Sequence, residues 1–259
     1  MSFWSAVAVA VAGMAAGMIN VVVGSGTLIT FPTLLFFGVN PLVANVSNNI
    51  GLVAGGVTGS WGYRHELTGQ APTLRRLMPL SFVGSIVGAG LLLVLPATAF
   101  KAIVPVLILI ALILVVAGPR LQARLAPGAQ DGARSAPSWH APVMRVGVFV
   151  AGMYGGYFGA AQGVLLMGLF SALSSESLQR LNGYKNVLAL VVNVVAAAVF
   201  LLFARDSIDW LIVLLVGGGA FVGGIVGARV GRRIPPPALR ALIIVIGLVA
   251  IIKLVWFTT

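Results

Sequence analysis

Pairs of asparagines four residues apart occur twice in this chain, each near the start of a long apolar segment. Asn45 and Asn49 form the first pair, and Asn182 and Asn186 form the second. Because residues at i and i+4 share one face of a helix, each pair would direct two amides to the same side. An amide in an apolar segment needs a hydrogen-bonding partner: the backbone, water or a bound substrate. The recurrence favours a polar cavity, and helix caps with interhelical bonds are the alternative.

A lysine lies inside the second of these apolar segments. Lys185 occupies the position that matches Asn48 in the first segment, and Asn193 lies two turns beyond Asn186 on the same face. A cation within an apolar run is energetically expensive and indicates a function, here the attraction of an anion. The alternative is that the side chain snorkels to the polar interface, since it lies about two turns into the helix. Glu176 is close enough in sequence to neutralise the charge.

Glycine-rich breaks precede both segments. The first is Gly24-Ser25-Gly26, and the second extends from Gly155-Gly156 through Gly159 to Gly163. A break leaves backbone N–H groups unpaired, and the positive end of the helix dipole that follows attracts anions. The polar side chains at the breaks are Asn20, Ser25, Thr27, Thr30, Tyr154, Tyr157, Gln162 and Ser171. Bonds from Ser and Thr to their own helix, and glycines that permit tight helix packing, are the alternative explanations.

The composition indicates that a lipid bilayer surrounds these residues. Of the 259 residues, 59% are hydrophobic and only 8% are charged, whereas roughly 25% are charged in an ordinary soluble domain. The net charge of +11 would suggest nucleic acid in a soluble protein, but here nearly all the arginines lie in short loops, as the positive-inside rule requires. The composition therefore excludes a soluble enzyme and a disordered chain, and we expect no nucleic-acid partner.

No set of residues in the sequence is typical of catalysis or metal binding. The chain has no Cys, and its two His lie in polar loops far apart, so neither a thiolate site nor a histidine metal site is expected. No carboxylate lies deep in an apolar run, which argues against a proton relay and leaves Na⁺ bound by neutral oxygens, or uncoupled movement, as alternatives. We expect a protein that is not an enzyme and that needs no cofactor and no metal.

Ten apolar runs follow one another along the chain, at about 3–22, 26–38, 42–62, 77–95, 99–118, 143–158, 161–173, 180–203, 208–230 and 238–257. Most approach the roughly 20 residues that a spanning helix needs. The runs at 26–38 and 161–173 are too short to span and each follows a break. Because no basic residue precedes the first run, we expect it to be a retained membrane segment and not a signal peptide.

The two halves of the chain repeat each other. Gly24 matches Gly159 at an offset of 135, and Ile86-Val87-Gly88-Ala89 matches Ile225-Val226-Gly227-Ala228 at an offset of 139. Between the halves, residues 119–142 are rich in Pro, Gly and Ala and carry four charges, which is typical of a linker.

Loop charge predicts how the halves are oriented. Basic residues gather in 63–76, in the linker and in 229–240, which places these segments in the cytoplasm and both termini outside it. The halves are then inverted relative to each other. The predicted fold is an all-α integral membrane protein with two inverted repeats and about 8–10 hydrophobic segments, two of them broken or re-entrant half-helices. Residues 1–118 form the first repeat, 119–142 a cytoplasmic linker and 143–259 the second repeat.

The residues around the first break resemble the first repeat of the TauE/SafE sulfite exporter family. The likeness lies in Gly24-Ser25-Gly26, Thr30-Phe31-Pro32, Leu34-Leu35 and the run Gly38…Pro41…Ala44-Asn45, and GMYGGYFGAAQGVLLMGLF at 152–170 resembles the family's glycine-rich second signature. The resemblance spans essentially the whole chain and implies a multi-pass inner-membrane transporter of sulfur-containing anions. Where the family often has a Gly run and a Pro, this chain has Ala160-Ala161-Gln162-Gly163, and a glutamine there would change anion selectivity.

Together these features predict a secondary transporter, because inverted repeats with paired broken helices are typical of that class. We expect it to move small sulfur-containing anions (sulfite, sulfonate or related organosulfur compounds) across the cell inner membrane, outward and by alternating access. An importer of a different small anion, a membrane assembly factor and an intramembrane enzyme are the alternatives. The expected partners are a small anionic substrate and the lipid bilayer, and a homo-oligomer is left open. The predicted substrate-binding residues are Asn20, Gly24, Ser25, Gly26, Thr27, Asn45, Asn48, Asn49, Tyr157, Gln162, Gly163, Asn182, Lys185, Asn186 and Asn193.

Overall fold

The computed structural model describes residues 2–125, 140–230 and 244–245. Every regular element in these ranges is helical, which confirms the predicted all-α class. The first half contains α1 (Phe3–Val22), α2 (Thr27–Phe36), α3 (Pro41–Gly62), α4 (Ala71–Val94) and α5 (Ala97–Leu125). The second half contains α6 (His140–Tyr157), α7 (Gln162–Leu173), α8 (Leu178–Phe203), the short 3-10 helix η1 (Arg205–Ser207) and α9 (Trp210–Val230).

These helices follow the predicted apolar runs closely. Nine of the ten runs correspond to the helices α1 to α9, and the tenth, 238–257, lies outside the described residues apart from two positions. Within the described ranges, α1, α4, α8 and α9 are long and apolar enough to cross a membrane. Helix α3 has a similar length but is less apolar, because it carries Asn45, Asn48 and Asn49. The prediction of a multi-pass membrane protein is therefore supported by helices in both halves.

The predicted linker differs from the structure at its first residues. Helix α5 continues to Leu125, so residues 119–125 are helical, and α6 begins at His140. Residues 120–125 read Arg-Leu-Gln-Ala-Arg-Leu, and all of these residue types are strong helix formers. The helix therefore continues past the end of the apolar run into the first residues of the predicted linker. The rest of the linker, 126–139, and most of the basic stretch 229–240 lie outside the described residues.

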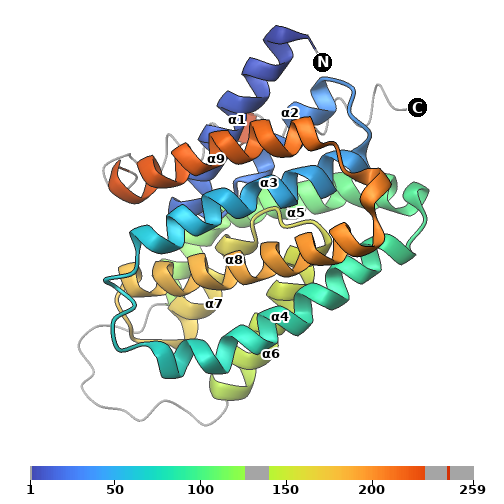
Figure 1. The fold of residues 1–259 in the computed structure, drawn as a ribbon. Helices are drawn as coiled ribbons and strands as arrows, with labels where there is room; N and C mark the ends of the chain where they lie inside the picture. Colours follow the sequence, from blue (N-terminus) through green and yellow to red (C-terminus); the bar gives the residue numbers. More distant parts are fainter. Residues whose placement is uncertain (1, 126–139, 231–243, 246–259) are drawn as a thin grey trace.

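The longer helices form a row through the molecule. Figure 1 shows α9, α3, α8 and α4 side by side in that order, and neighbours along this row pack against each other. Helix α1 packs against α9, and α6 packs against α4. Exchanging α1 with α6, α3 with α8 and α4 with α9 reproduces this set of pairings. The packing therefore repeats between the halves, while their inversion across a membrane stays a prediction.

Glycines bring the outer helices into backbone contact. A Cβ on Gly17 of α1 would lie 2.4 Å from the carbonyl oxygen of Ala220 in α9. In the matching pair, a Cβ on Gly88 of α4 would lie 1.9 Å from the carbonyl oxygen of Met153 in α6. Small residues at such crossings are typical of helix packing within a bilayer. These glycines are needed for close packing and not for chemistry.

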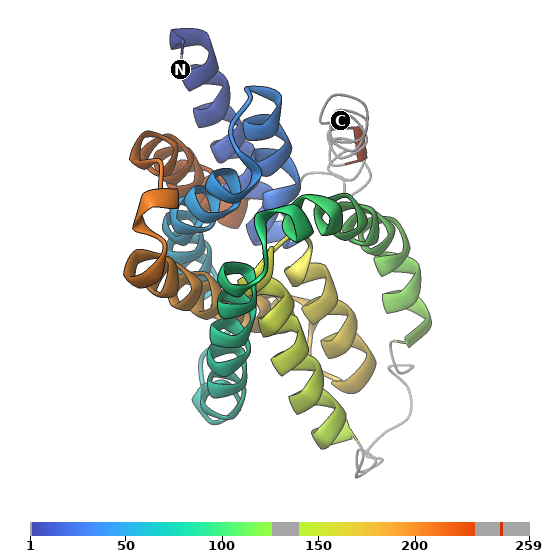
Figure 2. The ribbon, with the colours of Figure 1, turned by 90° about the vertical axis from the view of Figure 1, so that its right-hand side faces the viewer.

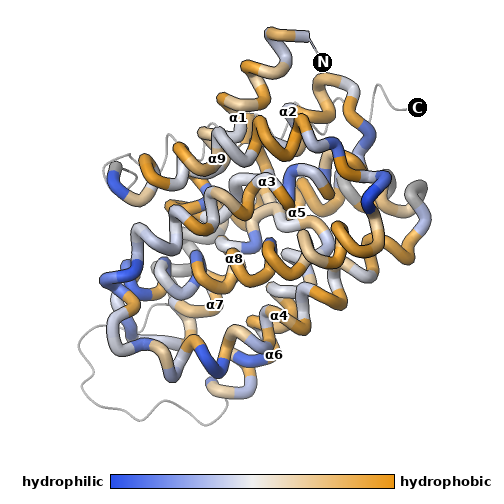
Figure 3. Tube along the Cα trace, viewed as in Figure 1, coloured by the Kyte–Doolittle hydropathy of each residue, from blue (hydrophilic) through white to orange (hydrophobic). Residues whose placement is uncertain are grey.

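The outer faces of the helices are apolar. Figure 3 shows hydrophobic residues along the middles of the helices and hydrophilic residues gathered at their ends. Large side chains such as Phe82 and Leu214 are 48% and 70% exposed. Apolar faces of this extent are rare on monomeric proteins that are surrounded by water, so they indicate that lipid surrounds these helices.

Candidate functional site

The two breaks meet near the centre of the molecule. Helices α1 and α2 form one hairpin and α6 and α7 form another, and Figure 2 shows the bends of the two hairpins close together. The backbone N–H of Gly163 donates to the carbonyl of Gly24 at 3.0 Å. A Cβ on Gly24 would lie 2.4 Å from the Cα of Gly163. The two bends thus touch through their backbones, which leaves no room for a side chain between them.

The short helices hold the bends inside the molecule. Helix α2 has 10 residues and α7 has 12, which at 1.5 Å per residue is about 15–18 Å, roughly half of the hydrocarbon thickness. Gly24 and Gly159 adopt φ values of +88° and +77°, which reverse the chain at each bend. The structure therefore has the two half-helices that the short apolar runs predict.

Ala161 adopts a backbone conformation that favours glycine. Its φ is +59°, and it is the single non-glycine residue with positive φ in the described part of the chain. It lies where the TauE/SafE resemblance leads us to expect a glycine run. The residue precedes α7 directly, so its conformation sets the direction in which Gln162 enters the helix.

We expect Ala161→Val to lower the midpoint of thermal unfolding more than Ala160→Val does. Both alanines are completely buried, so the cost of added volume is shared, but only Ala161 has positive φ. A β-branched residue is strongly disfavoured there, by about 1–2 kcal/mol beyond the packing cost. Unfolding monitored in detergent would check this, and equal midpoints for the two variants would contradict the assigned backbone conformation.

Two asparagines join the halves by matching bonds. The side-chain amide of Asn45 on α3 donates to the carbonyl of Tyr157 at the end of α6, at 3.0 Å. The amide of Asn182 on α8 donates to the carbonyl of Val21 at the end of α1, at 3.2 Å. Each asparagine thus caps the first helix of the other half. The sequence left open that these asparagines form helix caps and interhelical bonds instead of lining a cavity. Such a bond accounts for one N–H donor of each side-chain amide.

Lys185 also binds the end of α1. Its ammonium donates to the carbonyls of Asn20 and Val21 at 3.0 and 2.8 Å, and the residue is completely buried. The C-terminal end of a helix carries partial negative charge, which stabilises a cation there. The side chain therefore does not snorkel to the interface. Glu176 does not neutralise it either, because its carboxylate pairs with Arg180 one turn further along.

The first bend is held by a small polar network. The amide of Asn48 donates to the hydroxyl of Thr27 at 3.4 Å, and its oxygen accepts from the hydroxyl of Thr30. The side-chain oxygen of Asn20 accepts from the N–H of Gly26 at 3.5 Å. These bonds position the start of α2 against α3. Thr30 belongs to this network, although the predicted binding set left it out.

Further contacts link α3 and α4 to α8. The amide of Asn49 donates to the side-chain oxygen of Asn193 at 3.4 Å, so these two residues face each other across the halves. The hydroxyl of Ser85 on α4 donates to the carbonyl of Val192 at 2.8 Å. Sequence reasoning missed Ser85, because a lone serine in an apolar run usually bonds its own helix.

Several buried polar atoms near the bends have no hydrogen-bonding partner among the described residues. Six of them lie on residues of the predicted binding set: the Oγ of Ser25, the Oη of Tyr157, the Nε2 of Gln162, the Nδ2 of Asn186, and the Oδ1 atoms of Asn49 and Asn182. Buried polar atoms are almost always satisfied in native proteins, so each such atom needs a water or a ligand. Four of the six can donate a hydrogen bond, which suits an anion. Tyr154 and Ser171, which lie at the breaks but outside the predicted set, also carry an unpartnered hydroxyl.

Known proteins of similar sequence are membrane transporters by name. The family model for Sulfite exporter TauE/SafE matches residues 9–254. A probable membrane transporter protein, ORF9, of Sinorhizobium sp is 28% identical over 249 residues, covering 94% of this chain and 90% of its own. The probable membrane transporter protein YfcA of Escherichia coli (strain K12) is 24% identical over 243 residues, covering 94% and 87%. A similarly named protein of Haemophilus influenzae is 24% identical over 244 residues, covering 94% and 92%. No solved structure matches the chain.

Proposed function

The chain belongs to the Sulfite exporter TauE/SafE family, and from that premise we propose that it moves small sulfur-containing anions across the inner membrane by alternating access, with export as the working direction. The observation that carries the proposal is the group of unpartnered donors at the bends, on Ser25, Tyr157, Gln162 and Asn186. Donors without acceptors inside an apolar protein favour a ligand rich in lone pairs, and sulfite and sulfonate oxygens are such ligands.

The buried cation supports an anionic substrate. Two of the three N–H donors of Lys185 bind carbonyls at the end of α1, which leaves one for an anion. The aliphatic stem of Lys185 lies against the second bend, since a Cβ on Gly163 would be 2.9 Å from its Cδ. The positive charge is therefore held between the two bends. In a low-dielectric site such a charge attracts an anion far more strongly than it would in water.

The matching bonds between the halves suggest how access alternates. In the proposed cycle the halves are inverted, and the caps by Asn45 on α6 and by Asn182 on α1 open one at a time. Opening of one cap would expose the bends to one side of the membrane only. Because the two caps are alike, the inward- and outward-facing states would be close in energy, as a transporter requires.

The membrane potential is sufficient to drive export. Moving one negative charge out of a negative cytoplasm gains about 2.3 kcal/mol per 100 mV, and a divalent anion gains about twice that. Among the described residues, the carboxylates lie at helix ends or in loops, at Glu66, Glu176, Asp206 and Asp209, so the proposal includes no intramembrane proton relay.

We expect potential-driven flux of sulfite or of a two-carbon sulfonate in proteoliposomes, with chloride giving no flux. Each anion would be loaded in turn, with sulfate and acetate as the further comparisons, and a potassium diffusion potential would then be imposed. Liposomes without protein provide the baseline. Absence of flux for every anion from demonstrably folded protein, also after sodium and proton gradients are added, would overturn the proposal.

A further inference from the structure

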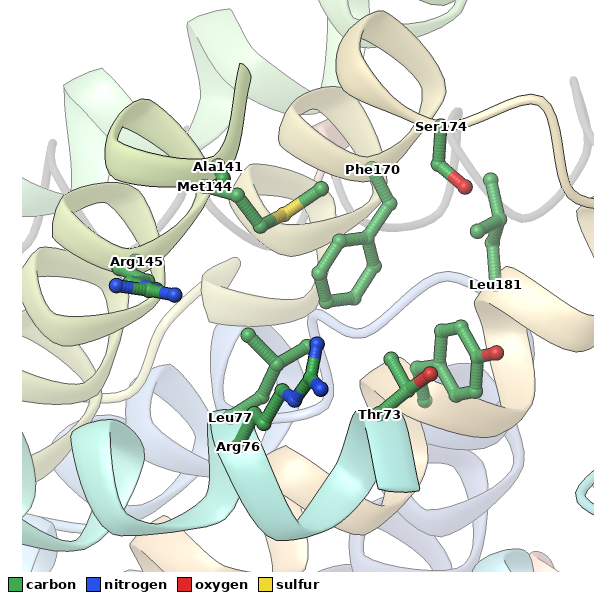
Figure 4. A pocket seen from close by; sticks show the side chains of 10 residues that line it. Thr73, Arg76, Leu77, Ala141, Met144, Arg145, Phe170, Ser174 and Leu181 are labelled. Carbon is green, nitrogen blue, oxygen red and sulfur yellow. The ribbon is translucent and has the colours of Figure 1, made fainter. Parts of the chain in front are cut away.

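A cavity lies away from the bends, where the ends of four helices meet. It has a volume of about 180 Å³ and lies between the starts of α4, α6 and α8 and the end of α7. Figure 4 shows the side chains that line it, and its polar lining comes from Thr73, Arg76, Arg145, Ser174 and Tyr184. Phe170 on α7 and Ser174 just after it line the cavity, at the end of that helix opposite Gln162. Phe170 lies eight residues from Gln162, which is about 12 Å along the helix axis, so the cavity lies away from the bends.

The charge around this cavity is positive. Arg76 and Arg145 line it, and no carboxylate does. Both arginines are exposed, and within the described ranges neither has a carboxylate partner, since Glu176 pairs with Arg180. Each guanidinium can therefore offer two parallel N–H donors to an oxyanion, the geometry that sulfonate, carboxylate and phosphate groups accept best.

The inner wall of the cavity is apolar. Leu77, Met144, Phe170 and Leu181 line it beside the arginines. In Figure 4 the Arg76 side chain extends toward the ring of Phe170, and that ring packs edge-to-face on Tyr184 at 6.1 Å between centroids. An oxyanion at the arginines would thus have hydrocarbon next to it, so the site suits an anion with a short apolar body better than a bare inorganic ion.

We propose that this cavity binds an amphipathic oxyanion, with its charged group on Arg76 and Arg145 and its hydrocarbon part against Phe170 and Leu77. In the chain's predicted orientation the cavity opens to the cytoplasm, beside the basic loop 63–76. A role for this cavity in collecting the transport substrate rests on the proposed function. The binding of an oxyanion in the cavity does not depend on that function. The ligand is either a free organic anion such as a short alkanesulfonate or the headgroup of an acidic lipid, because both present the same oxyanion and hydrocarbon.

Binding of butanesulfonate to the full chain in zwitterionic-lipid nanodiscs, measured by calorimetry, tests the proposal. We expect Arg76→Gln and Arg145→Gln each to raise the Kd about tenfold, as the loss of a charged hydrogen bond does. Arg75→Gln is the matched control, because Arg75 is exposed on the same helix turn but does not line the cavity. We expect it to change the Kd less than about twofold, in line with an exposed charge. An unchanged Kd in the double variant Arg76→Gln/Arg145→Gln would overturn the proposal.

Two further measurements complete the test. The first distinguishes a free organic anion from a lipid headgroup as the ligand, and the second distinguishes failure of the cavity proposal from failure of the proposed transport function. Phosphatidylglycerol added to the nanodiscs would raise the wild-type Kd only if the lipid headgroup competes for the arginines, and the double variant should then show no such effect. In proteoliposomes the double variant should raise the KM for sulfonate and leave the maximal rate intact. A Kd effect without any flux in the wild type would support the cavity and contradict transport, whereas flux with an unchanged Kd would do the reverse.

Discussion

We expect Gly24→Ala to abolish transport and to lower the yield of folded protein severely. Two costs coincide at this position: the left-handed φ of +88° and a Cβ that would lie 2.4 Å from the Cα of Gly163. The first is worth about 1–2 kcal/mol. The second requires the two bends to move apart, because the neighbouring atoms are all backbone atoms of Gly163. Together they reach the range above about 4 kcal/mol that single substitutions rarely exceed, a large share of a stability of roughly 5–15 kcal/mol.

The two costs can be measured separately in the same protein. Gly38→Ala introduces the strain alone, because Gly38 has a φ of +80° and nothing lies within 4 Å of its added Cβ. Gly163→Ala introduces the collision alone, since Gly163 is not among the glycines with positive φ. Gly168→Ala, in open space on α7, should be nearly neutral. Folded yield by size-exclusion chromatography and the flux of the recovered protein are the measurements.

The order of the four folded yields shows whether the collision between the bends adds to the backbone strain at Gly24. We expect Gly168→Ala to be the highest, then Gly38→Ala, then Gly163→Ala, with Gly24→Ala the lowest. If Gly24→Ala and Gly38→Ala were recovered equally well, strain alone would explain the loss. The contact between the bends would then have no structural weight, and the site built on it would have to be abandoned.

The parts of the fold that the sequence predicts are those set by local patterns. The length of an apolar run decides whether a helix can span, and a glycine break decides where it stops, so α2 and α7 follow from the residues alone. The end of α5 does not, because residues 120–125 are polar enough to suggest a linker yet are all of types with high helix propensity. Hydropathy does not detect the part of a helix that extends beyond its apolar run.

The partners of the buried polar residues are beyond local patterns. The four-residue spacing from Asn45 to Asn49 and from Asn182 to Asn186 predicts that each pair lines a polar cavity. The acceptors of Asn45 and Asn182, however, lie 112 and 161 residues away in sequence. Which carbonyl an amide reaches depends on how α3 and α8 pack against the hairpins of the opposite half. The sequence repeat indicates that the contacts come in pairs, while only the folded chain shows that they run between the halves.

For Lys185→Met we expect anion binding to weaken at least tenfold while most of the folded protein is retained. Methionine keeps the length and flexibility of the side chain and removes its charge. The carbonyl of Asn20 then loses its donor, which costs about 1–3 kcal/mol when nothing replaces it, while the carbonyl of Val21 keeps the bond from Asn182. Removal of a buried cation offsets much of this, because burying the charge is itself expensive. The anion has no such compensation. Anion-dependent thermal stabilisation and flux per folded molecule are the measurements.

Asn182→Ala distinguishes the two roles of the lysine. Asn182 donates to the same carbonyl of Val21 as Lys185 does, so its removal weakens the cap on α1 without changing the charge. Suppose the two variants lose folded yield and anion response in the same proportion. Lys185 would then be a cap for α1 only, and the positive charge between the bends would have no part in binding. If Lys185→Met loses the anion response while Asn182→Ala mainly loses stability, the charge attracts the substrate. Lys185→Arg should then restore part of the response, since the guanidinium keeps the charge but does not fit the space of the ammonium between the bends.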